Sequence, residues 1–317
     1  MNSYKKKVLE ARKQVLQLTL DQEKQIIDIY SKQAMKLIDE ILEMPESRTR
    51  THKIDVSRII NEYVKELYEK LNDNILKNTW ESSYIQRKVI LDFVDRVAPN
   101  RIVEDGLKKS ITRISDNAVR TLIAGGYYED GKTLSERLWK YTKQNGQDID
   151  TLIKMNVSGG ANVRTLASEL EKYVNPKNRS ISTNFKAGLN SYKISYNAQR
   201  LARTSITHAA TETQIQNAKS NPFSIGLKWN LSASHGSRMH GHQDECDRYA
   251  TADSYGLGAG VFPADKYPLE HPNGLCYATE EVDEKKAIKD IKAWASGDLE
   301  NKQMDEWFNN FKEKWNG

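Results

Sequence analysis

The sequence has few cysteines and no apolar run of the kind that crosses a membrane. Its two cysteines, Cys246 and Cys276, could form one bridge at most, which is too little to hold 317 residues together. No 18 consecutive residues are apolar, so a membrane-spanning helix is excluded. Charged residues stand near the N-terminus where a secretion signal needs an apolar core, and we therefore expect no such signal.

The sequence also lacks the glycine and serine motifs of common enzymes. It contains no Gly-x-x-x-x-Gly-Lys-Ser/Thr phosphate loop, no Gly-x-Gly-x-x-Gly fingerprint and no Gly-x-Ser-x-Gly nucleophile elbow. The three glycines of residues 256–260 follow no predicted strand, so they indicate a flexible turn and not a phosphate-binding loop. We therefore predict that the protein is not an enzyme.

The spacing of apolar residues predicts a mainly α protein with a small α+β domain toward its C-terminus. Long amphipathic helices are predicted over residues 16–41, 54–76, 84–97 and 101–124. Two strand-like segments, 225–232 and 275–282, flank an irregular loop rich in histidine, cysteine and glycine. The predicted organisation is a helical arm or bundle at 1–124, linking helices at 125–183, the α+β domain at 184–282 and a helical tail at 283–317.

Basic charge is concentrated in the middle of the chain. The net charge is +5, yet residues 151–200 carry eight basic and two acidic side chains. Such a segment can contact the phosphates of double-stranded DNA, or it can be a solvated helix face. The candidate DNA-binding residues are Lys172, Lys177, Arg179 and Lys186.

Residues with metal-ligand chemistry cluster in the irregular loop. His242 and Cys246 are four residues apart, which places both side chains on one face if a helix begins there. His271 and Cys276 are five residues apart across a Pro-Asn-Gly turn. Two such pairs separated by a loop predict a structural zinc site with the ligands His242, Cys246, His271 and Cys276. A metal would stabilise a segment that has few apolar side chains to pack.

Other interpretations of these residues remain open at this level. His235 or His240 could take the place of His242. The two cysteines could be separate buried side chains, or they could form a disulfide. Asp244 and Asp247 could belong to a metal-dependent enzyme, although acidic residues in a polar loop more often cap a helix or face solvent.

The order of four segments resembles a known protein family. Arg200-Leu-Ala-Arg-Thr-Ser-Ile-Thr on a long helix is followed by Lys228-Trp-Asn-Leu-Ser, by Asp244-Glu-Cys-Asp-Arg-Tyr-Ala and by His271-Pro-Asn-Gly-Leu-Cys. This order is similar to that of the minor head, or head-morphogenesis, proteins of tailed bacteriophages, the family named for the F protein of phage Mu. The likeness covers about residues 190–280. It departs from the family pattern at Gly274, where the family has a cysteine, and in a longer stretch before Asp244.

The resemblance implies a structural role in the virion. Members of this family take part in capsid assembly, without a known catalytic activity, and are present in a few copies near the portal. The partners it implies are portal protein and major capsid or scaffolding protein, with packaged DNA nearby. It implies a location in the phage head, and in the host cytoplasm during assembly. Two alternative hypotheses are a DNA-binding protein ejected with the genome and a metal-dependent enzyme centred on the His/Asp/Cys loop.

Overall fold

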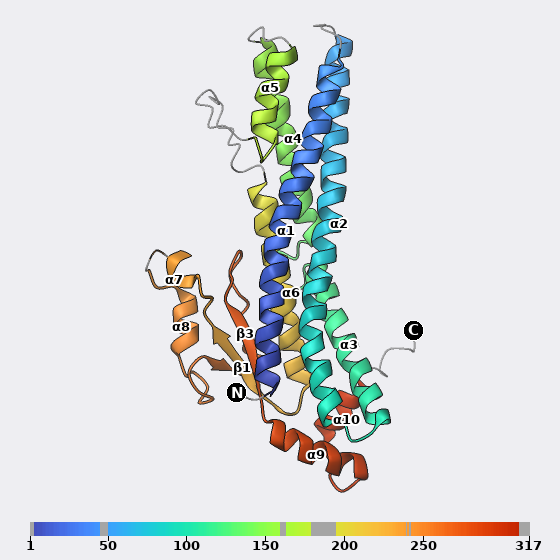
Figure 1. The fold of residues 1–317 in the computed structure, drawn as a ribbon, viewed down its shortest axis with the longest axis vertical. Coiled ribbons are helices and arrows are strands. Elements are labelled where there is room, and N and C mark those ends of the chain that lie inside the picture. Colours follow the sequence, from blue (N-terminus) through green and yellow to red (C-terminus); the bar gives the residue numbers. More distant parts are fainter. Residues whose placement is uncertain are drawn as a thin grey trace. The chain divides into compact units, whose positions relative to one another are not determined.

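The computed structural model describes residues 3–44, 50–158, 163–178, 195–238, 240 and 242–310. Over these residues the protein is mainly helical, with a small antiparallel sheet in its C-terminal half (Figure 1). The helices are α1 (Ser3–Leu42), α2 (Arg50–Val97), α3 (Arg101–Ile123), α4 (Leu134–Ser158), α5 (Val163–Val174), α6 (Tyr196–Ser220), α7 (His235–Arg238), α8 (Glu245–Thr251), α9 (Glu284–Ser296) and α10 (Lys302–Asn309). The predicted fold class is confirmed. None of the described helices has an apolar stretch of the length that a membrane span needs.

Helix α2 is longer than the sequence pattern predicted. The apolar periodicity indicated two helices, 54–76 and 84–97, but the structure has one helix from Arg50 to Val97. The residues between them look like a polar linker, yet Asn78, Thr79, Ser82 and Ser83 are buried. The Ser82 hydroxyl donates to the carbonyl oxygen of Ile206 at 2.6 Å, and the Thr213 hydroxyl donates to Ser83 at 2.7 Å. Because these side chains have buried hydrogen-bond partners, the helix continues through them.

The chain forms two compact units that do not follow the order of the sequence. Unit 1 contains Met1–Thr19, Asn78–Glu129 and Thr204–Gly317, and unit 2 contains Leu20–Lys77 and Asp130–Arg203. Helices α1, α2 and α6 each contribute residues to both units. Each unit therefore combines segments from more than one of the predicted ranges 1–124, 125–183, 184–282 and 283–317.

The sheet of unit 1 has three antiparallel strands in the order β2-β1-β3. Strand β1 (Ser224–Asn230) pairs with β2 (Val261–Phe262) on one side and with β3 (Tyr277–Val282) on the other. In the register of β1 and β3, Trp229 lies opposite Ala278 and Leu227 lies opposite Glu280. Strands β1 and β3 coincide closely with the two strand-like segments of the sequence, and the irregular loop between them contains α7, α8 and β2.

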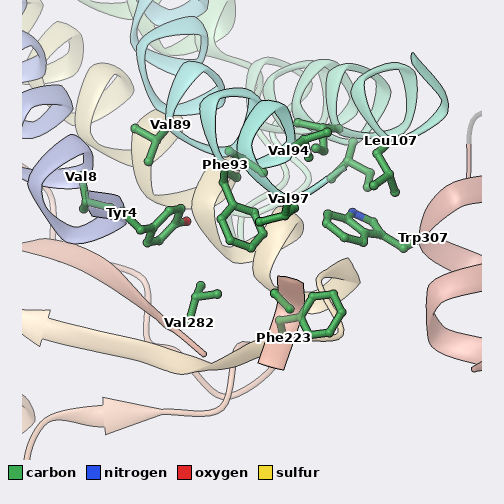
Figure 2. Packing of buried hydrophobic residues seen from close by; sticks show 14 of the residues in the cluster. Tyr4, Val8, Val89, Phe93, Val94, Val97, Leu107, Phe223, Val282 and Trp307 are labelled. Carbon is green, nitrogen blue, oxygen red and sulfur yellow. The ribbon is translucent and has the colours of Figure 1, made fainter. Parts of the chain in front are cut away.

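The core of unit 1 joins helices from both ends of the chain. Figure 2 shows Tyr4 and Val8 of α1, Phe93 of α2, and Trp307 of α10 among the buried side chains of one cluster. Phe223, just before β1, belongs to the same cluster and meets the Trp307 ring edge-on at 6.4 Å between centroids. The first turns of α1 are thus part of the packed core of unit 1.

Unit 2 has a core of its own. Its buried apolar side chains come from α1, α2, α4, α5 and the first turns of α6, and include Leu37, Leu67, Ile149 and Leu170. Inside it, the Asn145 side-chain amide donates to the Tyr30 hydroxyl at 3.0 Å. Helices α4 and α2 approach each other closely at Gly146. A Cβ at this position would lie 2.4 Å from the Val64 side chain.

Strand β3 carries a buried carboxylate in unit 1. Glu280 is 5% exposed, and its side chain accepts hydrogen bonds from the Tyr4 hydroxyl at 2.5 Å and from the Asn221 amide at 3.0 Å. Burial raises the pKa of Glu280 above its ordinary value, because removal from water disfavours the ionised form.

We expect Glu280→Gln to change how stability depends on pH. The pKa of Glu280 is higher in the folded than in the unfolded state, so its contribution to the free energy of unfolding increases as the pH falls through the folded pKa toward the ordinary value of 4.5. Glutamine keeps an acceptor for Asn221 and offers a donor to Tyr4, but it does not titrate. Urea unfolding at about pH 7.5 and about pH 5 should show that the wild type gains stability relative to the variant at the lower pH. The same pH dependence in both proteins would contradict this interpretation.

Candidate metal centre

The two cysteines of the predicted zinc site come together in unit 1. Cys246 lies in the first turn of α8 and Cys276 directly precedes β3, and their side chains are 1% and 3% exposed. They are free thiols and form no disulfide. His242 is exposed and precedes the N-cap of α8. Among the described residues, His242 belongs to none of the groups whose ligand atoms lie close together.

His235 occupies the position that the sequence pattern assigned first to His242. It begins the short helix α7, its side chain is 8% exposed, and its Nδ1 lies 3.7 Å from the Cys276 sulfur (α7 and α8 are labelled in Figure 1). The ligand atoms of His235, Cys246 and Cys276 all lie within 4.8 Å of one another. These three side chains form the buried group of soft ligands in unit 1.

The other nitrogen of His235 contacts a carboxylate. Its Nε2 lies 3.0 Å from Oδ2 of Asp247 and 3.5 Å from Oδ1 of Asp244. The contact with Asp247 favours the tautomer with its proton on Nε2, so the Nδ1 lone pair faces the cysteines. The hydrogen bonds of the Asp244 backbone N–H and of His235 keep the pKa of Asp247 below its ordinary value.

Both aspartates are fixed by the start of α8. Asp244 is the N-cap: its carboxylate accepts hydrogen bonds from the backbone N–H groups of Cys246 at 2.8 Å and Asp247 at 3.4 Å. The Asp247 carboxylate accepts in return from the Asp244 N–H at 3.0 Å. This reciprocal capping box sets the position of Cys246 as well, because the cysteine lies between the two aspartates.

His271 lies at the exposed side of the cluster. Its ligand atom is grouped with those of Asp244 and Cys246, all within 4.8 Å of one another, and its Nε2 is 3.8 Å from Oδ2 of Asp244. The His271 side chain is about half exposed. The structure therefore places three of the four predicted ligands, Cys246, His271 and Cys276, around one region.

Helix α6 holds the turn that carries His271 and Cys276. The Asn273 backbone N–H donates to the Thr204 hydroxyl at 2.9 Å, and the ring Nε2 of buried His208 lies 2.8 Å from the Glu270 carbonyl oxygen. Burial lowers the pKa of His208 to about 4, so this ring is neutral near pH 7 and its Nε2–H donates to that carbonyl. The two contacts fix the turn at its start and in its middle.

Glu270 fills the space beside Gly274, the position at which the similar phage family has a cysteine. Its carboxylate accepts a hydrogen bond from the Cys276 backbone N–H at 2.5 Å. A Cβ added at Gly274 would collide with the same carboxylate. The turn of this chain is thus built around Glu270, and a cysteine at position 274 would require the carboxylate to move.

The two sulfur atoms differ in their electrostatic surroundings. The hydrogen bond between the thiols lowers the pKa of Cys276 and raises that of Cys246, because the first sulfur accepts and the second donates. The Ser232 backbone N–H further favours the thiolate of Cys276, and so does the His235 ring when it is protonated. Aromatic side chains enclose the pair: Trp229 stacks on Tyr267 at 5.4 Å, and both belong to the core cluster of the cysteines.

The arrangement supports two kinds of chemistry. Two thiols and an imidazole, with a second imidazole nearby, are the ligands that zinc prefers in closed structural sites. The series Cys276, His235 and Asp247 also has the order of a nucleophile, a base and a carboxylate that orients the base. A nucleophile has to meet its substrate, and the 1–8% exposure of His235 and the two cysteines favours the metal.

The candidate DNA-binding residues do not form a free basic surface where the structure describes them. In unit 2, Lys172 pairs with Glu169 at 2.8 Å and Lys177 pairs with Asp28 at 2.5 Å. Both lysines thus already contact a carboxylate, which reduces the positive potential that phosphates would meet. Arg179 and Lys186 lie outside the described residues.

Comparison with known proteins returns no relative. No protein-family model, no curated protein and no solved structure matches this chain.

Proposed function

We propose that this chain is a minor structural protein of a tailed-phage head, and that it contacts portal or capsid protein. The observation that carries the proposal is that segments of all four family-like motifs are connected within unit 1. Thr204 of α6 holds the turn through Asn273, the Trp229 ring of β1 meets the Tyr249 ring of α8 edge-on at 5.1 Å between centroids, and Cys246 of α8 lies beside Cys276 at the end of the turn.

The burial of these residues supports a structural role for the motifs. His235, Cys246 and Cys276 have at most 8% of their surface exposed, and the two cysteines belong to a buried apolar cluster with Trp229 and Tyr267. A role in holding the fold together would account for the thiols and the imidazole of these residues without any catalytic reaction. Contact with portal or capsid protein would use the outer faces of the long helices.

Of the two alternatives, the ejected DNA-binding protein is the less favoured. Its candidate contacts Lys172 and Lys177 each pair with an acidic side chain. A metal-dependent enzyme would differ from a structural metal site in having an open ligand position that substrate or water can reach.

The test is to fractionate phage particles from cultures that produce the protein. DNA-filled heads, emptied heads and soluble protein are separated on a gradient, and peptides of the chain are quantified against portal and major capsid protein. We expect the chain in the heads, at a few copies per particle, and still present after the DNA has been released. Recovery only as soluble protein, or loss together with the DNA, would contradict the proposal.

A further inference from the structure

We propose that unit 1 binds one zinc ion through His235, Cys246, Cys276 and His271. The site would be a closed structural one, and it would connect α7, α8 and the turn before β3. This inference does not depend on the proposed role in the phage head.

The distances among the inner ligands suit zinc without rearrangement of the backbone. Zinc–sulfur bonds of about 2.3 Å and zinc–nitrogen bonds of about 2.0–2.1 Å in a tetrahedron separate a nitrogen from a sulfur ligand by about 3.6 Å. The observed separation of His235 Nδ1 and the Cys276 sulfur is 3.7 Å. The Cys246 sulfur lies within 4.8 Å of both atoms. An ion placed among the three would therefore need only small side-chain movements.

The contact of His235 with Asp247 is an independent observation that points to a metal. Histidines that bind zinc through one nitrogen commonly donate the other N–H to a carboxylate, which fixes the ring and increases its basicity. His235 presents Nδ1 to the cysteines while Nε2 lies 3.0 Å from Asp247. The capping box holds Asp247 in that place, so the ring is oriented by the start of α8.

His271 fits the fourth position better than Asp244 does. The Asp244 carboxylate is already engaged as the N-cap, with two backbone N–H groups of α8 as its donors. His271 is half exposed beside Asp244 and Cys246, and its turn is held by Thr204 and His208. Its ring lies outside the group that His235 and Cys276 form with Cys246, so it would turn inward to reach the ion. An imidazole with two thiolates and a second imidazole forms the S₂N₂ set that is typical of zinc.

The experiment measures zinc and thiols in the full-length chain purified under reducing, chelator-free conditions. We expect about one zinc per chain, and two free thiols after denaturation without reductant. Cys246→Ser and Cys276→Ser should each lose the zinc. The matched controls His242→Ala and His240→Ala remove nearby exposed histidines and should keep it.

Three results would overturn the proposal. One is less than about half an equivalent of zinc in the wild type after the purified protein is offered zinc. The second is the absence of free thiols, which would identify a disulfide. The third is full zinc content in both serine variants, which would place the ion elsewhere.

Because a serine variant could fail to fold, a ligand exchange gives a second test. Cys276→His keeps a zinc ligand, so the variant should still bind Co²⁺ in place of zinc, with a sulfur-to-cobalt absorption band reduced by about half. An unchanged band would exclude Cys276 as a ligand and overturn the assignment. His271→Ala should bind zinc more weakly, with water in the fourth position. Unchanged affinity in this variant would overturn the four-ligand set.

Discussion

Replacing Cys276 with serine should loosen the C-terminal half of unit 1 while most of the helical structure persists. Structural zinc contributes on the order of 10 kcal/mol to folding, which is comparable to the whole stability of a typical domain. The sulfur of Cys276 lies between His235 and Cys246, so its loss would release α7, α8 and the turn from one another. The helices of unit 2 have a separate core and should be unaffected.

Hydrogen–deuterium exchange measures this effect by region. In the Cys276→Ser variant, peptides from residues 232–276 should exchange much faster, and the thermal midpoint of unit 1 should fall. In the same variant, peptides from α4 should exchange at the wild-type rate. In the control variant His242→Ala, all peptides should exchange at the wild-type rate. Unchanged exchange over residues 232–276 would show that the cluster does not hold this segment.

Trp307→Ala should destabilise unit 1 by about 3–5 kcal/mol, the usual cost of removing a buried large aromatic side chain. Trp307 is 1% exposed, and in Figure 2 its ring lies among Phe223, Val97 and Leu107. Its removal would leave a cavity at the place where α10 joins α2, α3 and the start of β1. The loss combines the transfer free energy of the ring with the cost of that cavity.

Urea unfolding followed by circular dichroism tests the Trp307 prediction. Trp139→Ala is the matched control, because Trp139 is 43% exposed and the same atoms are removed. The control should lose clearly less, about 1–2 kcal/mol, because the Trp139 ring is partly exposed and meets Tyr68 edge-on. A similar loss for both variants would contradict the central place of Trp307 in the core.

Much of the fold could be predicted from local patterns. The long helices follow from apolar residues at helical spacing, and β1 and β3 follow from alternation. The continuity of α2 could not be predicted in this way, because Ser82 and Ser83 are buried only through partners on α6. The same holds for the start of α1: Tyr4 and Val8 pack in unit 1 with residues that are far away in the sequence.

The candidate site was partly predictable as well. The spacing of cysteine and histidine indicated that Cys246 and Cys276 could face one centre, and the structure brings them together. The choice of His242 assumed that a helix begins at that residue. Instead Asp244 has an extended backbone as the N-cap, so His242 precedes α8 and does not share its face. The sequence signal that could have favoured His235 is the pair Asp244 and Asp247 beside Cys246, because these carboxylates contact and orient the His235 ring.

The most direct test of the proposed zinc centre is X-ray absorption at the zinc edge of the purified protein. We expect two sulfur neighbours at about 2.3 Å and two nitrogen neighbours at about 2.0–2.1 Å. The sulfur component should fall to one neighbour in Cys276→His. A first shell of nitrogen and oxygen only, without sulfur, would contradict the claim that His235, Cys246, Cys276 and His271 hold the metal.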